Sequence, residues 1–189
     1  THFPEHFMSA ALSTELGNTD KIYALIQECK RMKIKVLSPN VTTSRKRFYV
    51  NKNAEIEYGL GVIKGVADSF IQHLCSIRNQ KVFNDLWDFS KKVDIKLGGK
   101  KSLEALSYSG AFDCIAPSRT IAIASVEDML KDGSSTTAAI GNASGDLFQD
   151  LNSKFDPYEK YKNINEMNLS EKLLLEKKSL GYYLSGHPV

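Results

Sequence analysis

Apolar residues recur at intervals of three and four in the first part of the chain, which is the spacing of one helical face. Residues 3–16 show this spacing, and Gly17, a common helix terminator, follows them. A second helix is predicted to begin with Asn18 or Thr19 as its N-cap. The apolar positions of these two helices are Phe3, Phe7, Met8, Ala11, Leu12, Ile22, Leu25, Ile26, Cys29 and Met32.

The pattern changes after residue 46. Two short runs, 47–50 and 55–60, flank the polar turn 51–54 and predict a β-hairpin. The second run leads into a glycine-rich turn, and a helix is expected over 68–78. These features predict a mainly α-helical fold of the α+β class with one small β-hairpin.

The following segment is again helical in pattern. A helix is predicted over residues 85–93, with Asn84 as its N-cap. Another is predicted to open at Pro117 and to run to Leu130, because proline suits the first helical position.

A change of composition follows that helix. Residues 132–145 are small and polar and have no periodicity, which predicts a flexible linker. The last predicted helix has capping-box spacing at Asn168 and Glu171 and ends at Gly181.

The overall composition is that of a globular protein. Hydrophobic residues make up 42% of the 189 residues, charged residues 25%, and the formal net charge is +3. Basic residues cluster at 30–35, 45–47 and 91–101, so a local cationic face is compatible with a nearly neutral chain. No apolar run approaches the ~20 residues of a membrane span, so we expect no membrane contact.

Cysteine and histidine usage argues against a disulfide framework and against a metal site. Cys29, Cys75 and Cys114 are odd in number and far apart, which favours a reducing compartment such as the cytoplasm. His2 and His6 have helical spacing but no third ligand nearby.

The glycine-rich stretch 59–74 carries the first candidate chemistry. A glycine in its turn permits a positive φ and a close approach of backbone. The N–H groups of the turn and of the following helix are expected to face a phosphate, and a lysine adds a contact without sequence information. A purely structural turn is the alternative. The turn residues are Ile63, Lys64, Gly65, Val66 and Ala67.

A looser copy of this turn follows in residues 100–113. Lys100 and Lys101 lead into it, and Phe112 stands where a glycine would favour binding, so this copy is expected to pack more and bind less. Paired helix–hairpin–helix turns can contact both strands of a duplex, which favours sequence-independent binding to the DNA backbone. The candidate binding residues of this copy are Lys100, Lys101, Ser109, Gly110 and Ala111.

Three stretches, GLGVIKGVADSFI, KKSLEALSYSGAFD and EKKSLGYYLSGHPV, resemble in order and spacing the alpha subunits of bacterial DNA polymerase III, the family C replicative polymerases. The stretches HFPEHFMSAALSTELGNTDKI and IQECKRMKIKVLSPNV are similar to the fingers region of that family. The resemblance covers nearly the whole chain.

The resemblance implies that the chain is a segment of a longer bacterial, cytoplasmic protein. It implies distal fingers helices over 1–46, the β-hairpin and a tandem helix–hairpin–helix over 47–116, a helix, linker and clamp-binding peptide over 117–150, and a C-terminal helical segment over 151–189. The catalytic aspartates of the family and their Mg²⁺ belong to a palm domain outside this segment. We therefore expect a non-catalytic chain without a cofactor.

The resemblance also implies contact with a sliding clamp and with the rest of the polymerase III holoenzyme. The family carries a glutamine-led clamp peptide ending in Leu-Phe, and here Ser144 replaces the glutamine. Two adjacent apolar side chains on a tether can fill a pocket of a partner. The corresponding residues are Ser144, Asp146, Leu147 and Phe148.

Two other functional classes remain open from the residues alone. One is a stand-alone helix–hairpin–helix module that binds DNA or acts as a scaffold. The other is a DNA glycosylase, in which Asp85 or Asp88 would be the catalytic aspartate after the hairpin. No glycine- and proline-rich loop leads into either aspartate, and no lysine occupies the nucleophile position, so this enzyme class is disfavoured.

Overall fold

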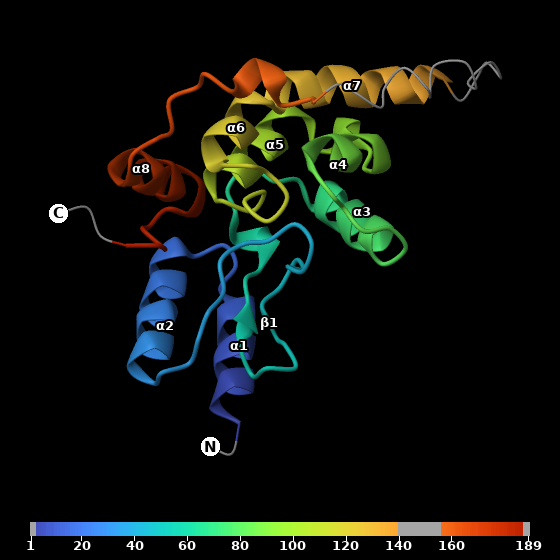
Figure 1. Ribbon diagram of the computed structural model, residues 1–189. Coiled ribbons are helices and arrows are strands. Elements are labelled where there is room, and N and C mark those ends of the chain that lie inside the picture. Colours follow the sequence, from blue (N-terminus) through green and yellow to red (C-terminus); the bar gives the residue numbers. More distant parts are fainter. Residues whose placement is uncertain (1–2, 140–155, 187–189) are drawn as a thin grey trace.

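The structure is a computed structural model that describes residues 3–139 and 156–186, without the side chains of 134–139. Within this part the protein is mainly helical with one small antiparallel hairpin, as the sequence predicted (Figure 1). The α-helices are α1 (Pro4–Thr14), α2 (Thr19–Arg31), α3 (Asp68–Arg78), α4 (Leu86–Lys92), α5 (Gly99–Tyr108), α6 (Arg119–Ala124), α7 (Val126–Ala139) and α8 (Leu169–Leu180).

The remaining elements are short. Strands β1 (Tyr49–Val50) and β2 (Ile56–Glu57) pair antiparallel, with Tyr49 opposite Glu57. The predicted hairpin is confirmed, although its paired strands are shorter than the apolar runs. The 3₁₀-helices are η1 (Leu60–Val62), η2 (Ile95–Leu97) and η4 (Glu159–Tyr161).

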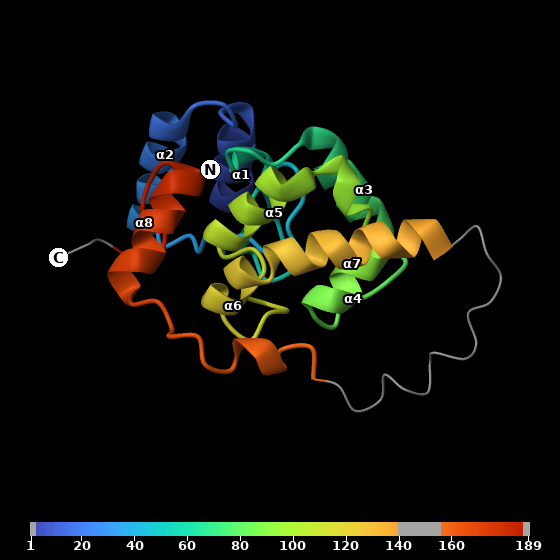
Figure 2. The same ribbon diagram turned by 90° about the horizontal axis from the view of Figure 1, so that it is seen from above.

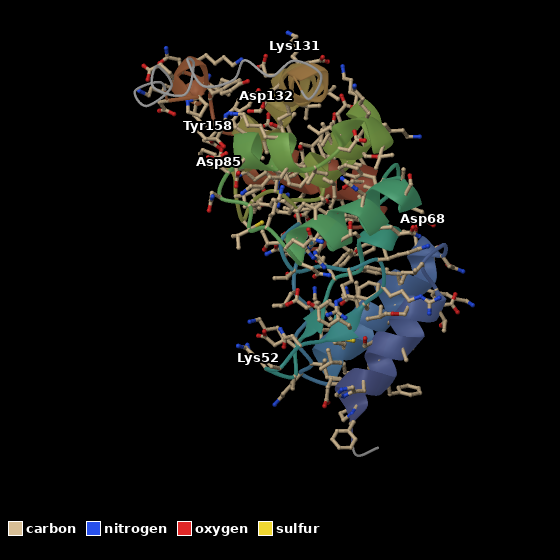
Figure 3. All side chains as sticks on the ribbon, turned by 90° about the vertical axis from the view of Figure 1, so that its right-hand side faces the viewer. Lys52, Asp68, Asp85, Lys131, Asp132 and Tyr158 are labelled. Carbon is tan, nitrogen blue, oxygen red and sulfur yellow. The ribbon has the colours of Figure 1, made fainter. Side chains whose placement is uncertain are left out.

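Two groups of elements lie one above the other in Figure 1. Helices α1 and α2 and the hairpin form the lower group, and α3 to α7 form the upper one. Figure 2 shows α8 beside both α2 and α5, so the last helix joins the groups. In Figure 3 the hairpin tip at Lys52 and the start of α3 at Asp68 lie on opposite sides of the molecule.

One hydrophobic cluster runs from Met8 of α1 to Tyr182 after α8 and includes residues of all the α-helices. This cluster crosses the boundaries predicted at residues 46, 116 and 150, so the predicted segments share one core. The boundaries themselves stay a prediction. The largest side chains buried in it are Tyr58, Phe70, Phe89 and Phe112.

Three of the predicted apolar positions are exposed instead of buried. Phe3 and Phe7 are 65% and 63% exposed, because α1 turns Met8 and Leu12 inward and leaves the neighbouring strip uncovered. Met32 follows the last residue of α2 and is 39% exposed.

Two predicted helix starts were misplaced. Asp85, not Asn84, is the N-cap of α4, and its carboxylate accepts from the N–H of Asp88. The helix expected to open at Pro117 is capped by Ser118 and ends at Ala124. Helix α7 then starts at Val126.

The predicted linker was also wrong in its first part, because α7 continues to Ala139. A Cβ added at Gly133 would lie 3.0 Å from Ile95 and 3.2 Å from the carbonyl oxygen of Ser90. The small residue thus lets α7 approach α4 and η2 closely, and packing overrides a weak intrinsic helix preference. Residues 140–145 lie outside the described residues.

Candidate nucleic-acid interface

The first turn connects η1 to α3 and has the backbone geometry that the sequence predicted. Gly65 has a φ of +99°, a conformation that glycine adopts without steric cost. Ile63 points into the core and is 3% exposed, whereas Lys64 is exposed. A single 3₁₀ turn, η1, lies between β2 and the hairpin turn.

The expectation that the turn presents bare N–H groups is wrong for four of its five residues, of which Ile63 donates to the carbonyl oxygen of Leu60 at 3.1 Å. The N–H of Lys64 donates to the carbonyl oxygen of Ser179 in α8, at 2.8 Å. The N–H of Ala67 donates to Oγ of Ser102 at 3.2 Å, and that of Val66 to the carbonyl oxygen of Ile63 at 3.4 Å. These amides are therefore occupied within the chain.

Other backbone N–H groups of the first turn and of the start of α3 remain free to donate a hydrogen bond. Among the described residues, the N–H groups of Gly65, Asp68 and Ser69 have no hydrogen-bond partner. The last two belong to the first turn of α3, where helical N–H groups lack an internal acceptor. The carboxylate of Asp68 stands at the same helix end and pairs with Nζ of Lys46 at 2.6 Å. The free N–H groups therefore lie near the carboxylate of Asp68, whose charge is balanced by Lys46.

Ser102 of α5 fixes the first turn in place. It is fully buried, and its hydroxyl donates to the carbonyl oxygen of Gly65 at 3.2 Å while it accepts from Ala67. A buried hydroxyl that both donates and accepts a hydrogen bond has its polar groups satisfied, so this contact between the turn and α5 is stable. The first turn is therefore built onto α5, the helix that leads into the second turn.

Lysine side chains provide the positive charge around this turn. Lys64 and Lys101 border a hollow of about 360 Å³ together with Gly65 and Glu104. In the part of the chain that the structure describes, neither lysine forms an ion pair. The aliphatic part of Lys101 would lie 3.2 Å from a Cβ at Gly65. Two lysine side chains without an ion-pair partner in the described residues thus line the hollow beside the glycine.

The side chain of Lys100 points toward α7 and not toward the first turn. Its Nζ forms an ion pair with Glu127 of α7, and Glu104 lies 3.9 Å away. The hydrogen bond that Lys100 donates to Glu127, and the negative charge of Glu127, raise the pKa of Lys100 above its ordinary value. Consecutive helical residues point about 100° apart, which separates Lys100 from Lys101. The structure therefore does not bring Lys100 to the first turn.

The second turn is built for packing. Ser109 and Ala111 are 1% and 0% exposed, and the N–H groups of Gly110 and Ala111 donate to Ser107 and Leu106 of α5. A Cβ at Gly110, whose φ is +79°, would lie 2.1 Å from Nη2 of Arg119. Gly110 thus makes room for a guanidinium of the chain itself.

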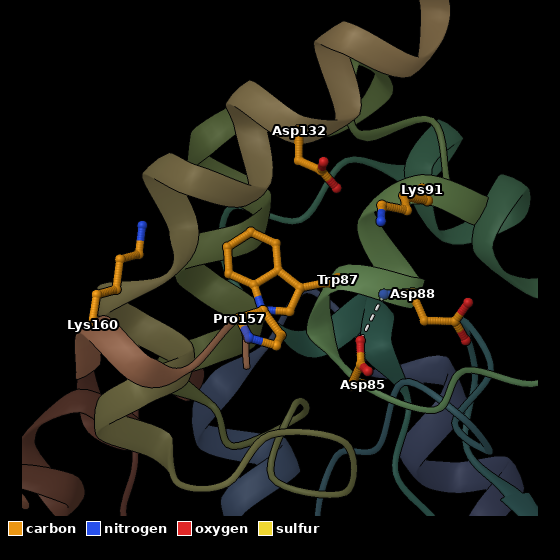
Figure 4. Close-up of a pocket in the computed structure, with 7 residues that line it drawn as sticks. All are labelled: Asp85, Trp87, Asp88, Lys91, Asp132, Pro157 and Lys160. Carbon is orange, nitrogen blue, oxygen red and sulfur yellow. Dashed lines mark hydrogen bonds between the residues drawn. The ribbon is translucent and has the colours of Figure 1, made fainter. Parts of the chain in front are cut away.

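The acids considered for a glycosylase serve the helix that carries them (Figure 4). Asp85 turns back to the N–H of Asp88, and the carboxylate of Asp88 points away from Trp87. Burial alone would raise the pKa of Asp88, but hydrogen bonds from Lys92 and Asn84 hold it below its ordinary value. Both aspartates border a hollow of about 560 Å³. Neither is left unengaged.

The clamp peptide, a metal site and a membrane span are the remaining features that the sequence analysis considered. Ser144, Asp146, Leu147 and Phe148 lie outside the described residues. Within the described ranges, no group of three His, Cys, Asp or Glu residues is arranged to hold a metal ion, and no helix is long and apolar enough to cross a membrane.

Sequence reasoning missed the contribution of α8 to this site. Lys178 and Ser179 lie against the first turn although more than a hundred residues separate them from it. The paired lysines of α8 were the only sign of it in the sequence, and paired lysines occur on many solvent-facing helices.

The fold and the turn define a helix-hairpin-helix protein. A family model described as a helix-hairpin-helix motif matches residues 33–122. The whole chain aligns with proteins named DNA polymerase III subunit alpha, with 41% identity to that of Pasteurella multocida, 36% to that of Escherichia coli K12 and 35% to that of Pseudomonas aeruginosa. These alignments cover 16% of the first two relatives and 18% of the third, so the chain spans about a sixth of their length.

Over its whole length the chain is therefore homologous to one segment of the DNA polymerase III alpha subunits.

Proposed function

We propose that this chain is a non-catalytic, duplex-binding part of a bacterial replicative DNA polymerase, acting in the cytoplasm. The observation that supports this most is the left-handed turn at Gly65 with Lys64 and Lys101 beside it, neither lysine being ion-paired within the described residues. The matched helix-hairpin-helix motif contains all three residues.

The proposed contact is electrostatic and independent of sequence. Each ammonium that neutralises a backbone phosphate releases condensed counterions from the duplex. The available amides of Gly65, Asp68 and Ser69 add donors, and the dipole of α3 favours an anion near its first turn. None of these groups reads a base edge, so binding positions the duplex without selecting a sequence.

The chemistry of nucleotide addition is proposed to lie outside this chain. Two-metal phosphoryl transfer needs carboxylates that converge on Mg²⁺. Asp85 and Asp88 cap α4, and we assign the catalytic aspartates and their Mg²⁺ to another part of the polymerase.

The duplex contact is tested by titrating a fluorescent duplex with the intact protein over a range of salt concentrations. Lys64→Gln and Lys101→Gln are each expected to reduce the slope of log K against log salt by about 0.9. Lys100→Gln is the matched control, since Lys100 is adjacent in sequence but pairs with Glu127. Equal slopes in all four proteins would show that the first turn is structural.

These lysine substitutions are a cleaner test than Gly65→Val, which we also expect to abolish binding. Valine at a φ of +99° is strained, and its Cβ would press on Lys101. Loss of binding by that variant would not separate a lost contact from a distorted turn.

We further propose that Leu147 and Phe148, with Ser144 and Asp146 before them, contact the sliding clamp of the holoenzyme. The support is the position of the Leu-Phe pair in the sequence and the family to which the chain belongs. Leu147→Ala combined with Phe148→Ala is expected to remove co-elution of the intact protein with its clamp. Unchanged co-elution would place the contact elsewhere.

A further inference from the structure

Helix α8 closes one side of the first turn. The carbonyl oxygen of Ser179 holds the N–H of Lys64, and α8 packs against α5, beside which it lies in Figure 2. The same hollow that Lys64 and Lys101 border is also lined by Lys178 and Tyr108. Three segments that are distant in sequence thus meet around Gly65.

Lys178 presents its charge to this hollow. It is exposed, and its Nζ lies 4.7 Å from the ring centroid of Tyr108, within reach of a cation–π contact. Like the other two lysines, it has no carboxylate partner in the described part of the chain. The neighbouring Lys177 differs, because its Nζ lies over the ring of Tyr183, at 5.2 Å from the centroid.

The charges around the hollow do not balance. Lys64, Lys101 and Lys178 supply three positive charges, and Glu104 is the only acid among the described residues that line it. Like charges gathered at one depression repel one another and raise the local potential, so the site favours an anion.

We infer that Lys178 of α8 is the third ammonium of a binding site for a nucleic-acid phosphodiester, which it forms with Lys64 and Lys101. This inference rests on the proposed function and extends it. The binding unit does not end with the matched motif at residue 122 but includes the last helix. Tyr108 orients the Lys178 ammonium, and the bond from Lys64 to Ser179 fixes α8 against the turn.

The test compares Lys178→Gln with Lys177→Gln in the intact protein, by the same salt-dependent duplex titration. The two substitutions remove the same charge from adjacent positions of one helix. Lys178→Gln is expected to reduce the salt slope by about 0.9, and Lys177→Gln is expected to leave it unchanged. Because both side chains are exposed, thermal unfolding of both variants should match the wild type.

The outcomes separate this inference from the proposed function. If Lys64→Gln lowers the slope and Lys178→Gln does not, the first turn binds DNA without α8 and the inference is wrong. Equal losses for Lys177→Gln and Lys178→Gln would mean a diffuse charge effect and would also overturn it. If Lys64→Gln and Lys101→Gln both bind as the wild type does, the proposed function fails, and the inference with it.

Discussion

Arg119 and Glu176 form a shielded ion pair across 57 residues of sequence. Nη1 of Arg119 lies 3.1 Å from Oε1 of Glu176, and the two side chains are 10% and 2% exposed. Arg119 also binds Asp113 of the second turn, at 2.7 Å. Glu176 accepts from the N–H groups of Leu184 and Ser185. The pair therefore ties the second turn to α8 and to the segment that follows it.

Removal of Arg119 should be strongly destabilising. Arg119→Ala leaves the carboxylate of Glu176 buried without its countercharge, and we expect the free energy of unfolding to fall by about 3–5 kcal/mol. Urea denaturation measures this. Arg31→Ala is the control, because Arg31 pairs with Glu28 on the exposed face of α2 and should change stability little. Similar losses in both variants would contradict the assigned role.

Three glycine-to-alanine variants separate steric conflict from backbone strain. Gly110→Ala meets both, since φ is +79° and the new Cβ would overlap Arg119. Gly99→Ala meets only strain, with a φ of +61° and no atom within 4 Å, and should cost about 1–2 kcal/mol. Gly17→Ala meets neither. Thermal unfolding should rank Gly110→Ala as the least stable and Gly17→Ala as nearly unchanged, and any other order would refute this explanation.

Tyr58, which directly follows β2, and Tyr182, which follows α8, share a buried hydroxyl–hydroxyl hydrogen bond. Burial raises the pKa of both phenols. Tyr182→Phe leaves the Tyr58 hydroxyl unsatisfied and should cost about 1–3 kcal/mol. Adding Tyr58→Phe removes the orphaned group, so the double variant should recover most of that loss. A double variant that is less stable than the single one would show that the bond itself is not the cause.

Cys29 should resist thiol reagents in the folded state. It is fully buried, and burial, with the nearby charge of Glu28, raises its pKa to about 11. A raised thiol pKa stabilises the fold below the ordinary value near 9, and this contribution is lost as pH rises through 11. With Cys75→Ser and Cys114→Ser in place, labelling should be slow at pH 8 and should accelerate toward pH 11. Rapid labelling at pH 8 without denaturant would contradict the burial.

Local chemistry made much of the helical fold predictable. Asn18 caps α2, and Asn168 with Glu171 forms a capping box on α8, as their spacing indicated. The positive φ at Gly65 was predicted for the same reason, because it depends on one residue and its immediate neighbours. The extension of α7 to Ala139 was not, since contact with η2 and α4 supplies the stability that residues 132–139 lack on their own.

The candidate site was only half predictable. Glycine and lysine composition pointed to Lys64 and Gly65, and those residues do lie together with Lys101. Nothing local showed that Ser179 and Ser102 occupy two of the amides, or that Arg119 fills the space over Gly110. Each of these partners comes from another element.

The chain's own order of residues determined where helices begin, where the backbone turns left-handed and which segments carry positive charge, because these depend on neighbours a few positions apart. Tertiary structure alone decided which donors remain open to an anion. That outcome depends on where α8 comes to rest, and its position is set by the buried pairs Arg119–Glu176 and Tyr58–Tyr182, which join residues distant in sequence.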